Sequence, residues 1–401
     1  MAIEKYGSVA EIVASQAQAG VDSSTRLYFF GSAPSASALN KIISVSSMAE
    51  ANTKLGVAAG DGYSLTDACL AAFSIVGVAS INCICVSNSA AYAASWIGNA
   101  AAETGVYVYE KELRENPPIS AILCAPGVSD GSFLAALLSE CKAAEGFKSY
   151  MIYDIPVAAA DFAESGFPDP DRIMLKKVDM IQDEYASCVW GNAEMADHSV
   201  VSGAAIRACL MAKSDADYGC PARVGGNLPI DSIISLAYID ANEEVAKFEM
   251  RKAEGDALST NGICSMLNRY GSFYSWGDHT SKFINDSVSD ERGRFENTMR
   301  ILMFLNNWFI RTFANIIDDN MTLQLKNDIL GVVQTKLDNM SAIGGVVGVP
   351  KCDFVPSDNP TDSLAQGHFV FRLSATAALP VKYLKAKIQY TDEGLSVYTQ
   401  E

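Results

Sequence analysis

The chain has 401 residues, 49% of them hydrophobic, and its 30 basic and 47 acidic side chains give a formal net charge of -17. This length allows two or three packed domains, each with its own core. No basic stripe is visible, so DNA and RNA are excluded as partners. The N-terminus lacks the pattern of a secretory signal. The most apolar run, residues 301–310, falls short of the roughly 20 residues needed to cross a bilayer, so we expect no membrane insertion.

The N-terminal region begins with a weakly patterned segment. Residues 1–22 are small and polar and carry too little apolar surface to fold alone, so we expect an extended arm. The run TRLYFFGSAPS (25–35) predicts a strand that ends in a turn. The run ISVSSMAEANTKLG (43–56) predicts a short strand, then a helix with Ser47 as its N-cap and Gly56 at its end.

Strands and helices continue to alternate after this point. The run PISAILCAPG (118–127) predicts a buried strand, residues 130–147 a helix, and residues 148–156 another buried strand. Residues 200–219 predict a helix of small residues that packs closely. This alternation favours a doubly wound or related open α/β layer within residues 23–255.

The ten cysteines are scattered singly in apolar surroundings. This is expected of reduced, buried side chains in a protein that is made in the cytoplasm. Cys83 and Cys85 are the closest pair, and one intervening residue would put both on the same face of a strand. A zinc site usually needs a second pair of ligands, and none follows. A core strand is therefore the better interpretation than a metal site.

The pattern changes in the last third of the chain. Residues 288–318 predict a long amphipathic helix, and residues 320–345 predict a second helix that ends at a glycine pair. Two alternating segments, HFVFRLSATA (368–377) and VKYLKAKIQYT (381–391), predict a closing pair of strands. A last short strand is expected at residues 395–399, and a terminal strand must pair somewhere or fray.

Motifs of catalysis are scarce. The chain has no G-x-G-x-x-G after a strand, no P-loop and no G-x-S-x-G elbow. His198, His279 and His368 are its only histidines, and none has the spacing of metal ligands. Carboxylate pairs lie at expected helix ends, where capping is the commoner explanation. We therefore expect no cofactor, no metal and no enzyme activity.

One stretch, GSFYSWGDHT (271–280), nonetheless contains a candidate base. Under the alternative hypothesis, the chain is an α/β enzyme with its active site near Asp278 and His279. Neighbours in sequence seldom face each other as a base and its orienting carboxylate must. The favoured interpretation is a turn permitted by Gly271 and Gly277 that buries nearby aromatic side chains.

The wider segment DALSTNGICSMLNRYGSFYSWGDHT (256–280) resembles contractile tail sheath proteins. Segments similar to that family occur in the family's order, including LYFFGSAP (27–34) and the run from 118 to 142. The resemblance covers residues 25–401. Asp278 and His279 depart from the Asn-Arg that is more common there. The residues that match the family motif are Asn261, Gly262, Ile263, Gly271, Trp276, Gly277 and Thr280.

The resemblance implies a compact two-domain α/β (α+β) subunit. Its parts would be an N-terminal arm (1–22), an outer α/β domain (23–255) and an α+β assembly domain (256–401) that ends in a linker and strand (387–401). Such subunits stack as six-fold rings into a helical sleeve around an inner tube and contract to drive the tube through a target envelope. The implied partners are further copies of the chain, the inner tube, and baseplate and terminator proteins.

The resemblance also implies particular contacts and a place of action. The particle would be a bacteriophage tail, a tailocin or a related contractile injection system, assembled in the bacterial cytoplasm. A tube or baseplate role is disfavoured because tube proteins are small and rich in β-structure. For inter-subunit strand exchange the candidates are Tyr6, Val9, Ile12, Ile388, Tyr390, Leu395, Val397 and Tyr398. For the inner-tube contact they are Lys326, Asp328, Lys336 and Asp338, for which a solvated helix face is the alternative.

Overall fold

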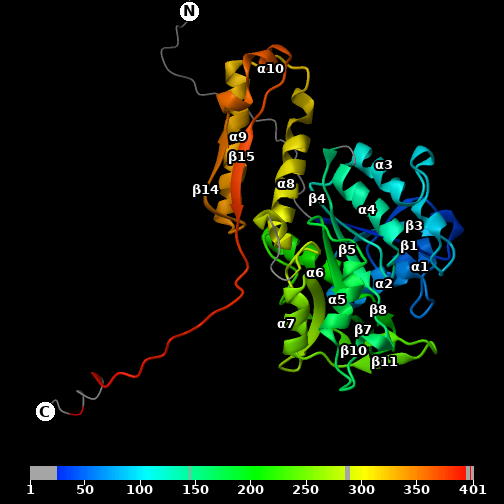
Figure 1. The fold of residues 1–401 in the computed structure, drawn as a ribbon. Helices are drawn as coiled ribbons and strands as arrows, with labels where there is room; N and C mark the ends of the chain where they lie inside the picture. Colours follow the sequence, from blue (N-terminus) through cyan, green and yellow to red (C-terminus); the bar gives the residue numbers. More distant parts are fainter. Residues whose placement is uncertain (1–24, 144–145, 285–289, 394–397, 399–401) are drawn as a thin grey trace, which may run out of the picture.

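The computed structural model describes residues 25–143, 146–284, 290–393 and 398, and Figure 1 shows their arrangement. An α/β body holds the larger, N-terminal part of the chain. A narrower unit of two long helices, one short helix and a β-hairpin projects from it, and we call residues 296–377 the projecting module. This mixture of helices and sheets confirms the predicted α/β class.

A nine-stranded sheet forms the centre of the body, in the order β2-β3-β1-β4-β5-β6-β12-β13-β9. The six strands from β3 to β12 run parallel, whereas β2, β13 and β9 pair antiparallel at the two edges. Buried parallel strands read as continuous apolar runs. The bounds are β1 Thr25–Ser32, β2 Ile42–Val45, β3 Ile81–Ser87, β4 Ser120–Cys124, β5 Tyr150–Ile155, β6 Ala186–Trp190, β9 Pro229–Ile230, β12 Ile263–Arg269 and β13 Ser272–Trp276.

Helices surround this sheet. Their bounds are α1 Met48–Leu55, α2 Ser64–Cys69, α3 Val108–Glu115, α4 Gly131–Ala143, α5 Pro170–Val178, α6 Gly203–Tyr218 and α7 Lys252–Thr260, and α2 continues as a π-helix over Leu70–Val76. The predicted caps of α1 are confirmed, since Ser47 accepts a hydrogen bond from the Glu50 amide and Gly56 adopts a φ of 76°. The small-residue helix α6 packs across β1, β4, β5 and β6, as its composition predicts.

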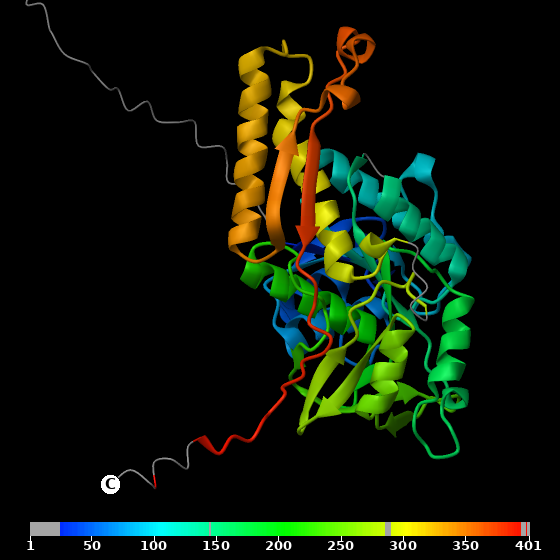
Figure 2. The ribbon, with the colours of Figure 1, turned by 60° about the vertical axis from the view of Figure 1, so that its left-hand side comes forward.

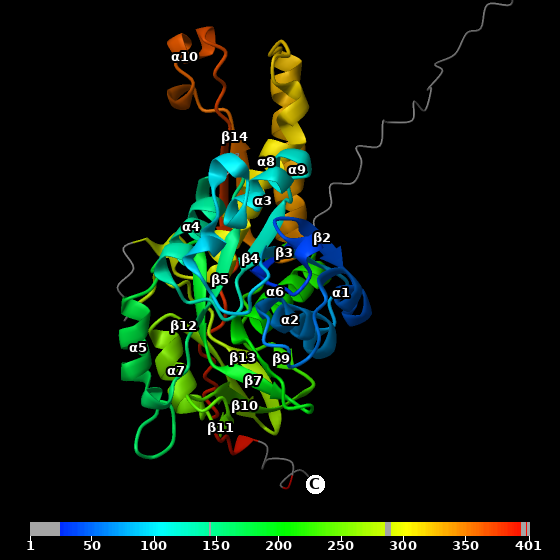
Figure 3. The same cartoon turned by 90° about the vertical axis from the view of Figure 1, so that its right-hand side faces the viewer.

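A smaller antiparallel sheet, in the order β11-β10-β7-β8, lies at the end of the body away from the projecting module (Figure 3). Its strands are β7 Asn192–Met195, β8 Val200–Val201, β10 Ile233–Ile239 and β11 Val245–Phe248. Cys83 and Cys85 lie buried in β3, as predicted for a core strand. Within the described part of the chain, no group of three or more His, Cys, Asp or Glu side chains could hold a metal.

The projecting module consists of α8 Glu296–Phe313, α9 Leu323–Ala342, β14 Val346–Asp353, α10 Thr361–Ala365 and β15 Arg372–Ala377 (Figure 2). It has its own apolar cluster, in which Phe304 and Trp308 of α8 meet Val333 and Leu337 of α9. The two helices predicted over residues 288–318 and 320–345 are confirmed, although α8 begins several residues later than the pattern indicates. No helix of the described residues is long and apolar enough to span a membrane.

The predicted closing strand pair is wrong in its partners. Residues 372–377 form β15, but their partner is β14, which the glycines and Pro350 of GGVVGVPKCD disguise. A bulge between Val347 and Lys351 accommodates these residues. Residues 381–391 are not in a strand, because no sheet edge of the described chain reaches them. Their apolar and polar side chains alternate as in a strand, but a segment becomes a strand only when it pairs with another strand.

The proposed boundary between residues 255 and 256 falls inside the body. β12 and β13 follow this boundary, yet β12 pairs with β6 and both strands belong to the nine-stranded sheet. Sheet membership alone would place the division after β13. The two-domain division, with its boundary between residues 255 and 256, therefore stays a prediction.

Candidate assembly surfaces

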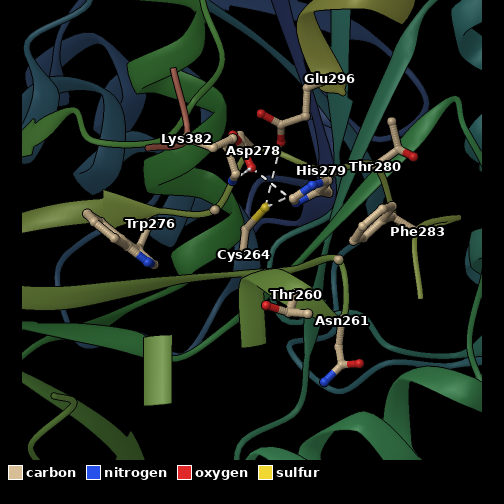
Figure 4. A network of polar contacts seen from close by, with 12 residues as sticks. Thr260, Asn261, Cys264, Trp276, Asp278, His279, Thr280, Phe283, Glu296 and Lys382 are labelled. Atoms are coloured by element: carbon tan, nitrogen blue, oxygen red, sulfur yellow. Dashed lines mark hydrogen bonds and ion pairs between the residues drawn. The ribbon is translucent and has the colours of Figure 1, made fainter. Parts of the chain in front are cut away.

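The Asp278–His279 pair is a buried structural element (Figure 4). The His279 ring stacks on the Phe283 ring, with ring centroids 3.9 Å apart and planes 13° apart, and the centroid of the Phe295 ring lies 5.1 Å from that of His279. His279 Nδ1 lies 3.0 Å from Asp278 Oδ1, although the geometry does not qualify as a hydrogen bond. A catalytic base must reach a substrate, and an imidazole stacked on two aromatic rings and only 6% exposed cannot.

Asp278 is occupied by a second partner, which comes from the C-terminal end of the chain. Lys382 Nζ lies 2.5 Å from Asp278 Oδ1. Burial alone would raise the pKa of Asp278, but His279 and Lys382 beside it hold that pKa below its ordinary value. Asp278 is therefore a structural anion. This geometry gives no support to the alternative enzyme hypothesis.

The family-motif residues also form scaffold. Gly262 has a φ of 66°, and a Cβ there would lie 2.3 Å from the Phe283 carbonyl oxygen. Gly271, with a φ of 82°, makes the turn between β12 and β13, and Gly277 has a φ of 96°. Trp276 Nε1 donates to Asp256 at 3.0 Å, and the buried Thr280 hydroxyl donates to the Gly293 carbonyl. The motif therefore specifies the conformation of the β12–β13 hairpin and of the residues that follow β13.

The base of the projecting module is fastened to the body by buried charges that the sequence patterns did not predict. Glu296, in the first turn of α8, accepts hydrogen bonds from Arg207 Nη2 at 2.7 Å, Ser187 Oγ at 2.7 Å and the Gly225 amide at 3.0 Å. One turn further, Arg300 pairs with Asp215 on α6. All four charged side chains are almost fully buried. α8 is therefore held in one orientation relative to the nine-stranded sheet.

The C-terminal extension, residues 378–393, is attached to the projecting module and the body at its beginning. The Ala378 amide donates to the Gly345 carbonyl at 3.1 Å, and Asn297 Nδ2 donates to the Ala378 carbonyl at 2.6 Å. Lys382 adds the ion pair with Asp278. We call residues 378–382 the root of the extension.

Beyond the root, the extension runs away from the body (Figures 1 and 2). Its large apolar side chains are 77% to 95% exposed, which is unusual for a folded chain. Leu384, Ala386, Ile388 and Tyr390 alternate with Lys385, Lys387, Gln389 and Thr391. This is the period of a strand with one apolar face.

A groove runs between α8 and the β14–β15 hairpin. It has a volume of about 730 Å³. A second hollow of about 250 Å³ shares Arg292, Leu302 and Asn306 with the groove. The apolar lining of the groove comes from Leu302, Leu305, Phe309 and Ile310 of α8 and from Val347, Val349, Phe371 and Leu373 of the hairpin and its approach.

The four candidate tube-contact residues of α9 do not share one face. Asp328 and Asp338 are exposed. Lys336 Nζ instead lies 4.7 Å from the centre of the Phe304 ring, and burial lowers its pKa. Lys326 Nζ lies 5.5 Å from the Phe354 ring. The lysines and the carboxylates of α9 therefore have separate surroundings.

The structure describes only some of the strand-exchange candidates. Tyr6, Val9, Ile12, Leu395 and Val397 lie outside the described residues. Ile388, Tyr390 and Tyr398 are described, and all three are exposed.

The whole chain has the fold of contractile sheath subunits. It is similar to the sheath of the extracellular contractile injection system PVC in its contracted state, at 13% identity and a TM-score of 0.70, with 98% of this chain and 100% of that chain covered. The contracted helical sheath of the anti-feeding prophage is 12% identical with a TM-score of 0.65, and 98% of each chain is covered. A sheath tail protein of Desulfitobacterium hafniense is 10% identical with a TM-score of 0.54, with 94% of this chain and 100% of that chain covered.

No protein-family model and no curated protein sequence matches the chain. At these low identities the likeness establishes the fold, and it confirms the sheath resemblance at that level. The similar structures cover this chain almost from end to end, so the fold includes both the body and the projecting module.

Proposed function

We propose that this protein is the structural subunit of a contractile tail sheath, in a phage tail or a phage-tail-like particle. Subunits would stack as six-fold rings around an inner tube, bind baseplate and terminator proteins at the two ends, and contract to drive the tube through a target envelope. Assembly would take place in the bacterial cytoplasm. The fold shared with injection-system sheaths supports this role.

The observation that carries the proposal is the exposed run of residues 383–391 in the C-terminal extension, which is in no strand. A segment with the alternation of a strand and a fully exposed apolar face is a poor end state for a lone subunit. The hairpin is incomplete in the complementary way, because among the described strands β14 and β15 pair only with each other. Each of these two strands therefore has an edge with which a further strand could pair.

A second copy of the chain can satisfy both needs. We infer that the extension of one subunit adds as a strand beside the hairpin of a neighbour and turns its apolar side chains toward the groove along α8. Backbone hydrogen bonds would supply affinity, and the alternate side chains would supply register. The N-terminal arm with Tyr6, Val9 and Ile12 is proposed to add a further strand. Because donor and acceptor surfaces differ, the contact is heterologous and produces an open helical lattice.

Truncation tests strand donation directly. Removal of residues 387–401 should leave a folded monomer that no longer forms tubes in negative-stain micrographs. The extension also offers a matched pair of triple variants. The triple variant L384N/I388N/Y390N should abolish tubes, because the apolar face is lost. The triple variant K385N/K387N/Q389N should leave tubes in place, because only the polar face changes. Tubes of normal number from the truncated chain would contradict strand donation.

The enzyme hypothesis has its own test. His279→Ala should remove no turnover of any substrate, because the imidazole only fills a slot between aromatic rings. The variant should instead lower the thermal midpoint of the monomer.

A further inference from the structure

The turn of the β12–β13 hairpin carries an unusual residue. The last paired residues of the two strands are Arg269 and Ser272. The turn between them consists of Tyr270 and Gly271, whose φ angles are 54° and 82°. Two positive φ angles are those of a type I′ turn, in which asparagine or aspartate followed by glycine is the favoured sequence. A bulky side chain at positive φ is rare, because its Cβ crowds the backbone. The first turn position is therefore poorly suited to its tyrosine.

Packing within the subunit does not explain why a tyrosine occupies this position. Tyr270 is 91% exposed, so its ring is not part of the core. No other large hydrophobic residue of the described body is more than 67% exposed. Asparagine would fit the turn better and would place no aromatic ring in water. The tyrosine therefore suits a contact outside the subunit better than it suits the turn.

An unbalanced positive charge lies beside the exposed ring. In the part of the chain that the structure describes, Arg269 pairs with no carboxylate, and its guanidinium lies 5.0 Å from the centre of the Tyr270 ring and 5.9 Å from that of Trp276. Lys252 Nζ lies 5.5 Å from the Trp276 ring, but Asp256 balances its charge. The two rings orient the guanidinium without neutralising it. We call Arg269 and Tyr270 the hairpin tip.

The hairpin tip lies toward the end of the body that is away from the projecting module. β12 runs parallel to β6, and β6 is followed almost directly by β7 of the smaller sheet. The C-terminal end of β12 therefore points toward the side of the smaller sheet (Figure 3). A contact made there is separate from the groove between α8 and the β14–β15 hairpin.

We propose that the hairpin tip binds an acidic surface of a second copy of this chain. The inference rests on the proposed function, in which copies of the chain lie side by side. Each copy has a formal net charge of -17, and such charges keep copies apart unless their contacts set a cation against carboxylates. Tyrosine and arginine are also residues in which binding energy concentrates at interfaces. A second copy supplies the carboxylate that Arg269 lacks in its own subunit.

Replacement of Tyr270 by Asn separates the turn from the contact. Asparagine is favoured at this position, so the thermal midpoint of the monomer should not fall. The purified variant should nonetheless need an at least about tenfold higher protein concentration than the parental chain to form sleeves in negative-stain micrographs. Arg269→Gln should raise this concentration as well. The matched control is Tyr218→Asn at the end of α6, where another exposed tyrosine lies beside an arginine, and it should leave the concentration unchanged.

A photoreactive phenylalanine analogue at position 270 identifies the partner. Sleeves are assembled from a mixture of isotope-labelled and unlabelled chains, which distinguishes links between copies from links within one copy. The analogue at position 270 should link to an acidic peptide of a second copy, and the same analogue at position 218 should form no such link. The absence of a link between copies would overturn the inference. A lower thermal midpoint of Tyr270→Asn would also overturn it, because the ring would then be needed inside the subunit.

The concentration measurement distinguishes this inference from the proposed function. If the parental chain forms no sleeve at any concentration, the proposed function fails. If the parental chain and Tyr270→Asn form sleeves at the same concentration, the proposed function stands and the contact of the hairpin tip alone fails.

Discussion

The two ends of the projecting module are attached in opposite ways. At the base of α8, Glu296 and Arg300 hold two ion pairs that water hardly reaches. After β15, the extension is held as far as Lys382, and its apolar side chains then stand in solvent. The difference separates the part that packs within the subunit from the part that is proposed to pair with a neighbour. A rigidly fastened helix pair and hairpin carry a segment with the alternation of a strand, with which no strand of the described residues pairs.

The largest expected effect comes from breaking the mount. Glu296→Ala leaves Arg207 buried without its carboxylate, and loss of one partner of a buried pair costs about 3 to 5 kcal/mol. Urea unfolding of the purified monomer measures this change in the free energy of unfolding. Glu291→Ala is the control, because its side chain is 82% exposed and should change stability by less than about 0.5 kcal/mol. Equal effects of the two substitutions would show that α8 is not fastened at Glu296.

A smaller effect is expected at the root of the extension. Lys382 is half exposed, so Lys382→Ala should cost only about 1 kcal/mol. Its clearer consequence is local, since the Ala378 amide bonded to Gly345 should exchange its hydrogen several times faster. Hydrogen exchange read by mass spectrometry measures this, with Lys385→Ala as the control. Unchanged protection would mean that Asn297 alone holds the root.

Acid should weaken the same root. The folded-state pKa of Asp278 lies below its unfolded value of about 3.9, so the ionised group stabilises the fold at higher pH. That contribution is lost as pH falls through the folded pKa. The stability difference between the parental chain and Asp278→Asn should therefore stay constant from about pH 7 to 5 and shrink below about pH 4. Urea unfolding across this range measures it, and a difference that widens in acid would contradict the sign.

The smallest effect is expected in the extension itself. Ile388 is 95% exposed, so Ile388→Asn should change monomer stability by less than about 0.5 kcal/mol. Thermal unfolding at a concentration below that of assembly provides the measurement. A large loss would show that the extension packs on its own body, and it would remove the contrast between the two ends.

The sequence was most informative where local pattern and structure agree. The buried runs of β1, β4 and β5 and the caps of α1 could be placed because each depends on neighbouring residues alone. β14 was missed because its glycines and proline resemble a loop, and its place in a sheet depends on β15, about twenty residues away.

The candidate surfaces were harder to predict. The sequence pattern did not predict the exposure of residues 383–390, since it paired their alternation with residues 368–377. The pairing of Arg207 with Glu296 was not, because it joins residues 89 apart in sequence. A signal did exist, since Arg207 and Arg300 each interrupt an apolar helical run. Ionisable residues in such runs are rarely buried without a partner.

The fastening of α8 also makes it a lever. The helix has 18 residues, which corresponds to a length of about 27 Å. Because its base turns with the body, a rotation of roughly 10° would carry its far end through about 5 Å, close to the spacing of about 4.8 Å between paired strands. A modest turn of each body is therefore enough to move the hairpin by one strand width. Residues 383–391, which are exposed and in no strand, are the part of the chain that such a movement would have to accommodate.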